Sequence, residues 1–415
     1  KLAVFSTSFF EWHLLKASYA LFAILKEKNL LDKVGFKDLG AGGIACASVE
    51  LAEAGGYGAK IDVADIPTSM KNLAPAVILC SETQERFMWV AAPAITPLIL
   101  KHYNETFALP KVAEKAQAKV IGKITAGGDY VVRYKSGKVI NAKARDITQG
   151  LSYDRICKIK SSKLIEPQLP FLHHHNQTLL QLLGHENIAS RKAIFETYDK
   201  QVQGRTIVES GMADAGVIQP FNSDKFPKEI RATGIALASD QNPRFNKIDP
   251  YLGAVNAVAE AVRNVVAVGA LPIAISDCLC YGNPEKPEQM AEFAAGVKGI
   301  ADICMALELP VIAGNVSFYN ESKNGAIPPS PIISCLGKLS DIGKAITLSF
   351  KQANSLIVMV GERKDECGGS VYYSLYNQLG SRAPQPNFAE IKTQITALNI
   401  AIGKELVLAA HDIAD

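Results

Sequence analysis

The sequence predicts an α/β protein with more than one domain. From about residue 230 onward, strand-like apolar runs alternate with amphipathic helix-like stretches, which is typical of sheets covered by helices. Near residue 40, a glycine-rich turn joins a short apolar run to a helix-like stretch. The chain has 415 residues, a length that suggests two to four domains of ordinary size.

Composition and charge exclude several classes of protein. Hydrophobic residues make up 48% of the chain and charged residues 20%, so the material for buried cores is ample and no disorder signature is present. The net charge is only +3, and Lys and Arg are scattered among Asp and Glu, so we expect no nucleic-acid partner. No apolar run approaches the roughly twenty residues that would span a bilayer, so we expect no membrane association. Eight cysteines without a C-x-x-C spacing predict reduced thiols in a cytoplasmic protein.

Two groups of potential metal ligands are expected to bind no metal. Cys278 and Cys280 form the one close cysteine pair, and we expect their strand-like spacing to point the two side chains in different directions. The run His173-His174-His175 lies in a stretch without sustained periodicity. Adjacent residues of an extended chain point in opposite directions, so these three imidazoles cannot easily converge on one ion. We interpret the run as part of a solvated linker.

The first part of the chain predicts a helix, a strand–turn–helix and a hairpin. The stretch "FFEWHLLKASYALFAILKEKNL" is apolar at helical spacing. In "KVGFKDLGAGGIACASVELAEAGG" we expect a short strand, a turn at residues 38–43 and a helix at about 44–54 that stops at Gly55-Gly56. The alternating stretch "DYVVRYKSGKVINAKA" predicts a β-hairpin around Ser136-Gly137.

The later part predicts alternating strands and helices. We expect strands at "EIRATGIALASD", at "LPIAISD" ending at Asp277, at "LPVIAG" and at "PIISCLGKL". A helix begins near Pro287. The expected buried face of that helix is Met290, Phe293, Val297, Ile300, Cys304 and Leu307. For the helix in "GAVNAVAEAVRNVVAVG", the face is Val255, Val258, Ala259, Val262, Val265 and Val266.

Polar residues follow two of the predicted strands. Asp277 comes after "LPIAIS", and Asn315 and Ser317 come after "VIAG". Ligands gather at the carboxyl ends of strands in α/β folds, and carboxylate and amide oxygens suit Mg²⁺. Gly314 would let the backbone approach a phosphate, and Ser317 could bond a substrate oxygen. The alternative is that Asn315 and Ser317 form a simple chain-reversing turn, and spacing alone favours that turn.

Two further motifs each allow both a ligand-binding and a purely structural interpretation. Asp38 in "DLGAGG" could ligate Mg²⁺, or it could cap the helix that follows. The segment "SETQER" at residues 81–86 offers a carboxylate, hydroxyls, an amide and a guanidinium, which suits a phosphorylated, polyhydroxylated small molecule but also an ordinary surface turn. The short match between "KDLGAGG" and the final "HDIAD" aligns Asp38 with Asp412, which suggests a duplicated architecture.

Six motifs in order resemble one enzyme family. "KDLGAGGIACAS", "SETQERF", "NPRFNKIDPYLGAVNAVAEAVRN", "SDCLCYGNPEKPE", "AGNVSFYNES" and "HDIAD" resemble phosphoribosylformylglycinamidine synthase, the ATP-dependent amidine-forming ligase of purine biosynthesis. "GNPEKPE" and "GNVSFYNE" are specific to that family, whereas the Asp-Gly motif is shared with a superfamily that includes aminoimidazole ribonucleotide synthetase.

The resemblance implies two similar halves, each with a sheet-forming N-terminal domain and an α/β C-terminal domain. By that likeness, residues 1–155 are expected to be the C-terminal-type domain of the first half, with an incomplete start, and residues 156–190 a linker. Residues 191–344 are expected to be the N-terminal-type domain of the second half, and residues 345–415 the beginning of its C-terminal-type domain. The chain would then cover the middle of the duplication.

The resemblance also implies site residues, matched motif by motif. Glu82, Thr83 and Gln84 are expected to hold substrate, and the family usually has Ser where this chain has Thr83. The other expected contacts are Asp38 and Asn315 with Mg²⁺, Asp277 and Gly314 with ATP, and Ser317 with substrate.

The activity implied is conversion of formylglycinamide ribonucleotide to formylglycinamidine ribonucleotide with ATP and ammonia. The catalytic His of the family lies in a first N-terminal domain that this sequence lacks, so we expect the chain to be a portion of a longer protein. Nothing resembles a glutaminase, so ammonia is expected from a glutaminase subunit or domain, with a small accessory subunit also possible by the same likeness. The alternatives are another synthetase or kinase of the superfamily, and a non-catalytic nucleotide-binding scaffold.

Overall fold

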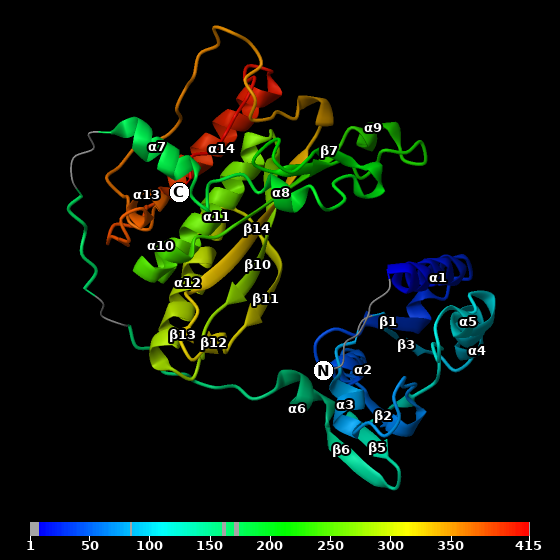
Figure 1. The fold of residues 1–415 in the computed structure, drawn as a ribbon. Coiled ribbons are helices and arrows are strands. Elements are labelled where there is room, and N and C mark those ends of the chain that lie inside the picture. The colour runs from blue at the N-terminus through cyan, green and yellow to red at the C-terminus, as the bar shows by residue number, and fades with distance from the viewer. Residues whose placement is uncertain (1–7, 84, 160–162, 170–173, 415) are drawn as a thin grey trace. The chain divides into compact units, whose positions relative to one another are not determined.

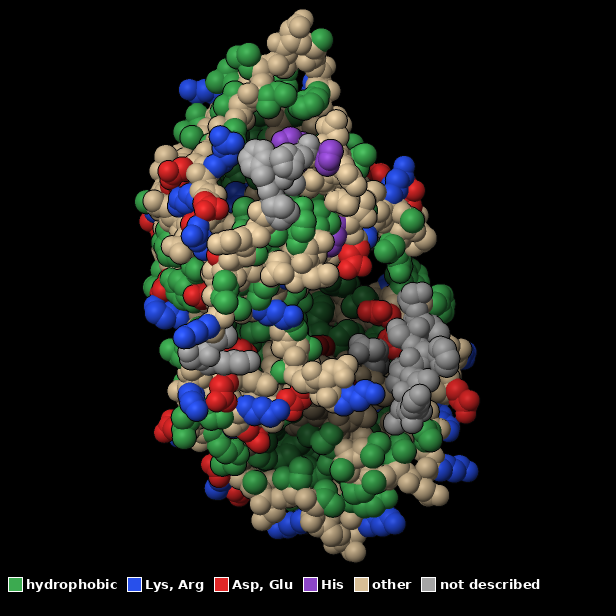
Figure 2. Space-filling model, turned by 60° about the vertical axis from the view of Figure 1, so that its left-hand side comes forward, with side chains coloured by type: hydrophobic (Ala, Val, Ile, Leu, Met, Phe, Trp, Pro, Cys, Tyr) green, Lys and Arg blue, Asp and Glu red, His purple; other side chains and the backbone are tan. Residues whose placement is uncertain are grey.

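The computed structural model describes residues 8–83, 85–159, 163–169 and 174–414. The chain forms two compact units, one ending at Tyr153 and the other beginning at Asp154 (Figure 1). Gln84 and His173, both singled out from the sequence, lie outside the described residues. Within the described ranges, no helix is long and apolar enough to cross a membrane. Basic and acidic side chains are interspersed on the face shown in Figure 2.

The first unit contains two sheets with helices packed beside them. One sheet pairs β1 and β3 in antiparallel fashion, and the other has the strand order β4-β2-β5-β6. The strands are β1 (Val34–Asp38), β2 (Gly58–Asp62), β3 (Phe87–Ala91), β4 (Gly122–Thr125), β5 (Asp129–Tyr134) and β6 (Gly137–Lys143). The helices are α1 (Ser8–Glu27), α2 (Gly43–Glu53), α3 (Pro75–Cys80), α4 (Thr96–Lys101), α5 (Leu109–Val112) and α6 (Ala144–Gln149). Two short 3-10 turns, η1 (Leu31–Lys33) and η2 (Val63–Asp65), and one π-helix, η3 (His102–Thr106), lie between them.

The sequence-based expectations for this unit are confirmed. β1, the glycine turn and α2 follow one another, and α2 ends just before Gly55-Gly56. β5 and β6 form the expected antiparallel hairpin. Ala47, Val49 and Ala52 of α2 are almost fully buried in one core with residues of β2 and β5. This packing holds the start of α2 in place against the sheet, and with it the turn that follows β1.

The second unit is built on a six-stranded sheet with the order β11-β10-β14-β9-β8-β7. The strands are β7 (Thr206–Val208), β8 (Gly216–Ile218), β9 (Gly234–Asp240), β10 (Leu271–Cys280), β11 (Val311–Ser317) and β14 (Ser330–Leu339), with the small pair β12 (Glu321–Ser322) and β13 (Gly325–Ala326). The helices are α7 (His175–Leu183), α8 (Lys192–Phe195), α9 (Lys228–Arg231), α10 (Pro243–Ile248), α11 (Pro250–Ala267), α12 (Pro287–Leu307), α13 (Val371–Ser374) and α14 (Phe388–Gly403), with turns η4 (Val202–Gly204) and η5 (Ile342–Lys344). All pairs in the six-stranded sheet are antiparallel except β10 with β11, which is parallel.

Helices cover one face of this sheet, as Figure 1 shows for α11 and α12. Every residue of the face predicted for α11 is buried, and these side chains share one core with Val217, Ala236, Ile275 and Ile333 of the sheet. Side chains on the other sheet face are open: Leu237, at 52%, and Ile332, at 37%, are exposed. The two faces of the sheet therefore have different surroundings, which matters for every side chain along β10 and β11.

Three sequence expectations for this unit need correction. The strand predicted at 229–240 begins only at Gly234, because Lys228–Arg231 form the short helix α9. Val297 of α12 is 39% exposed, and Gly296 and Gly299 are buried instead. A side chain at Gly296 would meet the Tyr281 hydroxyl at 2.1 Å, so the helix uses glycine where its neighbours come closest.

The third correction concerns strand ends. β10 continues beyond Asp277 to Cys280, and β11 continues beyond Gly314 to Ser317. The proposed domain ranges remain predictions. The structure shows α7 within residues 156–190, and α13 and α14 within residues 345–415.

Candidate functional site

A glycine turn in the first unit presents Asp38. This residue is exposed at the end of β1, and α2 begins at Gly43 with Gly42 as its N-cap in the left-handed region, at φ 71°. No side chain caps α2, so the helix-capping alternative for Asp38 does not hold. The Asp38 carboxylate lies instead at an open hollow of about 260 Å³ that Gly40, Cys46 and Glu50 also line. Asp38 is thus placed where an exposed carboxylate can meet a ligand.

The segment at 81–86 packs directly against this glycine turn. The Gly42 N–H donates a hydrogen bond of 3.1 Å to Oε1 of Glu82. Arg86 stabilises the segment, since its guanidinium donates to the carbonyl oxygens of Ser81 at 2.6 Å and Thr83 at 2.9 Å. Burial lowers the pKa of Arg86. The structure therefore brings the Asp38 turn and Glu82 together, as a common site requires.

Gly43 is the residue on which this contact depends most. Its φ is 55°, and a Cβ there would lie 2.4 Å from the Ser81 carbonyl oxygen. We expect Gly43→Ala to lower the free energy of unfolding by at least about 1 kcal/mol more than Gly56→Ala does, because overpacking against backbone adds to the left-handed strain. Gly56 is a matched control, since its φ is 75° and a Cβ there would meet nothing within 4 Å. Urea unfolding measures both; equal losses would show that Gly43 is not a packing requirement.

In the second unit, the paired strands β10 and β11 carry four of the predicted site residues. Asp277 lies opposite Gly314, and a Cβ on Gly314 would lie 2.2 Å from Oδ1 of Asp277. The glycine is therefore required by the Asp277 side chain, which leans over it. Asp277 is half-buried, and burial raises the pKa of its carboxyl.

Asn315 and Ser317 lie on the opposite sheet face from the Asp277–Gly314 pair, because successive side chains of a strand alternate. The turn alternative for these two residues is wrong, since both lie within β11. Asn315 is exposed, and the Ser317 hydroxyl lies 3.4 Å from Oδ1 of Asn320 and 3.1 Å from its Nδ2. The residues expected to contact ATP and those expected to contact Mg²⁺ and substrate thus lie on different faces of one strand pair.

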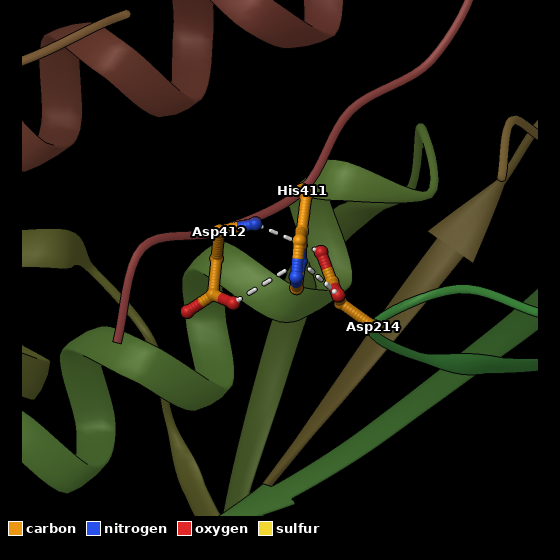
Figure 3. A group of neighbouring side chains, drawn as sticks. All are labelled: Asp214, His411 and Asp412. Atoms are coloured by element: carbon orange, nitrogen blue, oxygen red, sulfur yellow. Dashed lines mark hydrogen bonds and ion pairs between the residues drawn. The ribbon is translucent and has the colours of Figure 1, made fainter. Parts of the chain in front are cut away.

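A group of titratable side chains that the sequence reasoning missed lies elsewhere in the second unit (Figure 3). The His411 Nδ1 is 2.7 Å from Oδ1 of Asp214 and 3.8 Å from Oδ1 of Asp412. The Asp412 N–H also donates to Oδ2 of Asp214 at 2.9 Å. One ligand atom from each of the three lies within 4.8 Å of the others, which is close enough to share a cation.

Further charged groups surround Asp412. The Asp412 side chain is 8% exposed, and the Arg263 guanidinium lies 3.8 Å from it. The amide of Asn264 lies near the carboxylates of both Asp240 and Asp412. The sequence held a signal for this group. Glu260 and Asn264 stand one turn apart on the largely apolar α11, and Asp412 aligns with Asp38 in the match between "KDLGAGG" and "HDIAD".

Glu260 in this group makes stability depend on pH. Burial, together with Asp240 and Asp412, raises its pKa to about 9. Because its pKa is raised, Glu260 keeps a proton in the folded protein that it releases in the unfolded chain. The contribution of Glu260 to the free energy of unfolding is therefore fully present below about pH 4.5 and is lost as the pH rises toward 9. We expect Glu260→Gln, which stays neutral, to gain stability relative to the unchanged protein between pH 5.5 and pH 8.5, by on the order of a few kcal/mol. Urea unfolding of chelator-treated protein at both pH values measures this, and a pH-independent difference would contradict it.

Two domain models of one known protein family match the parts of the chain that carry the predicted site residues. The sequence model of the AIR synthase related protein C-terminal domain matches residues 11–135, and that of the N-terminal domain matches residues 212–339. These two domains together account for more than half of the chain, which belongs to the AIR synthase related family. The matched ranges contain Asp38 and Glu82 in one domain and Asp277, Gly314, Asn315 and Ser317 in the other.

Within that family, the resemblance to phosphoribosylformylglycinamidine synthase is confirmed. The chain is 42% identical to phosphoribosylformylglycinamidine synthase subunit PurL of Methanothrix thermoacetophila, over 97% of this chain and 52% of that protein. It therefore spans about half the length of this relative. The α/β architecture, with one C-terminal-type and one N-terminal-type domain in that order, agrees with the expected duplicated halves.

Solved structures of Thermotoga maritima PurL share the fold. The structure described as PurLQS has a TM-score of 0.63 and 25% identity, over 84% of this chain and 53% of that chain. The complex with FGAR has a TM-score of 0.61 and 26% identity, over 82% and 50%. The complex with ATP has a TM-score of 0.60 and 25% identity, over 80% and 50%.

Proposed function

We propose that this chain forms part of an ATP-dependent carbon–nitrogen ligase that converts formylglycinamide ribonucleotide to formylglycinamidine ribonucleotide in purine biosynthesis. The observation that carries the proposal is the 42% identity to the Methanothrix thermoacetophila synthase subunit over 97% of this chain. Relatives of the same fold are complexes with ATP and with FGAR, which supports the same pair of substrates here.

The reaction asks the protein mainly to position reactants and neutralise charge. The amide oxygen of the substrate attacks the γ-phosphorus of ATP and releases ADP, and ammonia then displaces phosphate from the activated carbon. In this proposal Glu82, Thr83 and Gln84 of the first unit are substrate contacts, and Ser317 is a substrate contact of the second unit, each considered within its own unit. The N–H of Gly42 orients the Glu82 carboxylate at 3.1 Å, which supports a fixed position for this contact.

Asp277 and Gly314 would contact the nucleotide. Asp277 leans over Gly314, so its half-buried carboxylate fills the space that a side chain at residue 314 would occupy. Asp38 in the first unit and Asn315 in the second are each proposed as an Mg²⁺ ligand. Their chemistry fits, because Asp38 is exposed and not used as a helix cap, and Asn315 offers an exposed amide oxygen. When bound, Mg²⁺ would neutralise phosphate charge.

Ammonia would come from a glutaminase subunit or domain, with a small accessory subunit as a second partner. Two observations support these partners: the sequence holds no cysteine in a glycine-flanked nucleophile elbow, and a related structure is described as PurLQS. All eight cysteines are free thiols, which suits the reducing cytoplasm.

The test measures phosphate release by the full-length protein with ATP and an ammonium salt. We expect turnover only when formylglycinamide ribonucleotide is present, with one phosphate released per amidine formed. Turnover with a different acceptor would favour another synthetase of the superfamily. Tight nucleotide binding without turnover on any acceptor would favour a non-catalytic scaffold.

A further inference from the structure

Cys278 and Cys280 lie side by side on β10, contrary to the sequence-based expectation that they point in different directions. That expectation is wrong because residues two apart on a strand share one face. Their Sγ atoms are 3.8 Å apart, and both side chains are half-buried. The face is the open one, since Cys278 is in register with the exposed Ile332 of β14.

We propose that Cys278 and Cys280 form a two-thiolate site for Zn²⁺. Two sulfur ligands about 2.3 Å from a tetrahedral Zn²⁺ are separated by about 3.8 Å, which is the separation found here. Binding replaces two S–H bonds by two Zn–S bonds and releases two protons, so no oxidant or reductant is needed. The rigid strand already holds both sulfurs at the required distance, so little ordering accompanies binding.

The surroundings can complete the coordination. Cys278 is in register with Asn315 of β11, and Cys280 with Ser317, but these two residues are the proposed Mg²⁺ and substrate contacts and neither is a Zn²⁺ ligand in this inference. Because β11 is the edge strand and is exposed along most of its length, water can reach the remaining two positions. This inference concerns binding alone and does not depend on the proposed function.

The experiment uses reduced, chelator-treated full-length protein titrated with Zn²⁺ against a chromophoric chelator. We expect Cys278→Ser and Cys280→Ser each to weaken this site at least about a hundredfold, since loss of a direct ligand exceeds the cost of losing supporting residues. Cys157→Ser, which removes an exposed thiol of the same unit, is the matched control and should leave the affinity unchanged. Equal Zn²⁺ affinity in all variants would overturn the proposal.

Two further readouts separate this site from others and from misfolding. Cd²⁺ should give thiolate-to-metal charge-transfer absorption that the Cys278→Ser protein lacks, which the oxygen and imidazole ligands near Asp412 cannot produce. In the unchanged protein, one equivalent of Zn²⁺ should protect both Cys278 and Cys280 from alkylation, as mapped by mass spectrometry, while Cys157 still reacts. The protection does not require any variant to fold, and its absence would overturn the proposal.

Discussion

Asn315→Ala in the full-length protein is expected to lower Mg²⁺-dependent turnover by at least about ten- to a hundredfold, judged by what even supporting residues of metal sites cost. Its thermal stability should change little. Asn315 is exposed on the edge strand β11, and its side chain makes no hydrogen bond with the described part of the chain. Steady-state turnover over a range of Mg²⁺ concentrations, together with a melting curve, measures both effects.

Asn324→Ala is the matched control for this change. Asn324 is also exposed and lies between β12 and β13, a few residues beyond Asn315 in sequence. We expect near-normal turnover from it. If Asn315→Ala also kept a near-normal rate at limiting Mg²⁺, the assignment of Asn315 as a metal ligand would fail.

Gly314→Ala is expected to weaken ATP binding by about ten- to a hundredfold, because displacement of a positioned group by about 1 Å has effects of that size. The added Cβ would lie 2.2 Å from Oδ1 of Asp277, so the carboxylate must move. We also expect a loss of about 1–3 kcal/mol in the free energy of unfolding from overpacking. Calorimetric titration with ATP and urea unfolding measure the two effects.

Gly216→Ala separates the collision from a general effect of alanine on a strand. Gly216 lies at the start of β8, and a Cβ there would come no closer than 4.0 Å to the Val208 carbonyl oxygen. It should bind ATP normally and unfold almost as the unchanged protein does. Similar ATP affinities for Gly314→Ala and Gly216→Ala would contradict the role of the Asp277–Gly314 pair.

Local patterns predicted much of the fold because most elements are locally consistent. The buried face of α11 follows from apolar residues at helical spacing, and the turn between β1 and α2 follows from its glycines. The local sequence patterns did not predict where β10 and β11 end. Gly and Asn are poor strand residues, but parallel pairing with β10 keeps Gly314 and Asn315, and Ser317 after them, in the ladder. Tertiary pairing therefore overrode local propensity at the predicted site.

The group around Asp412 shows a second limit. Its members come from a loop at Asp214, the end of β9, the middle of α11 and the segment at His411, so only the folded chain brings them together. Polar residues on an apolar helix gave a local signal for Glu260 and Asn264, but no sequence pattern paired them with Asp214. By contrast, the contact between Gly42 and Glu82 joins two motifs that the sequence had already singled out.

The most direct test of the proposed reaction follows one oxygen atom. Formylglycinamide ribonucleotide carrying a heavy-oxygen label in the amide carbonyl is turned over by the full-length protein with ATP and ammonia. If the amide oxygen attacks the γ-phosphorus, the label must appear in inorganic phosphate, with one labelled phosphate for each amidine formed. Unlabelled phosphate alongside amidine product would contradict the account.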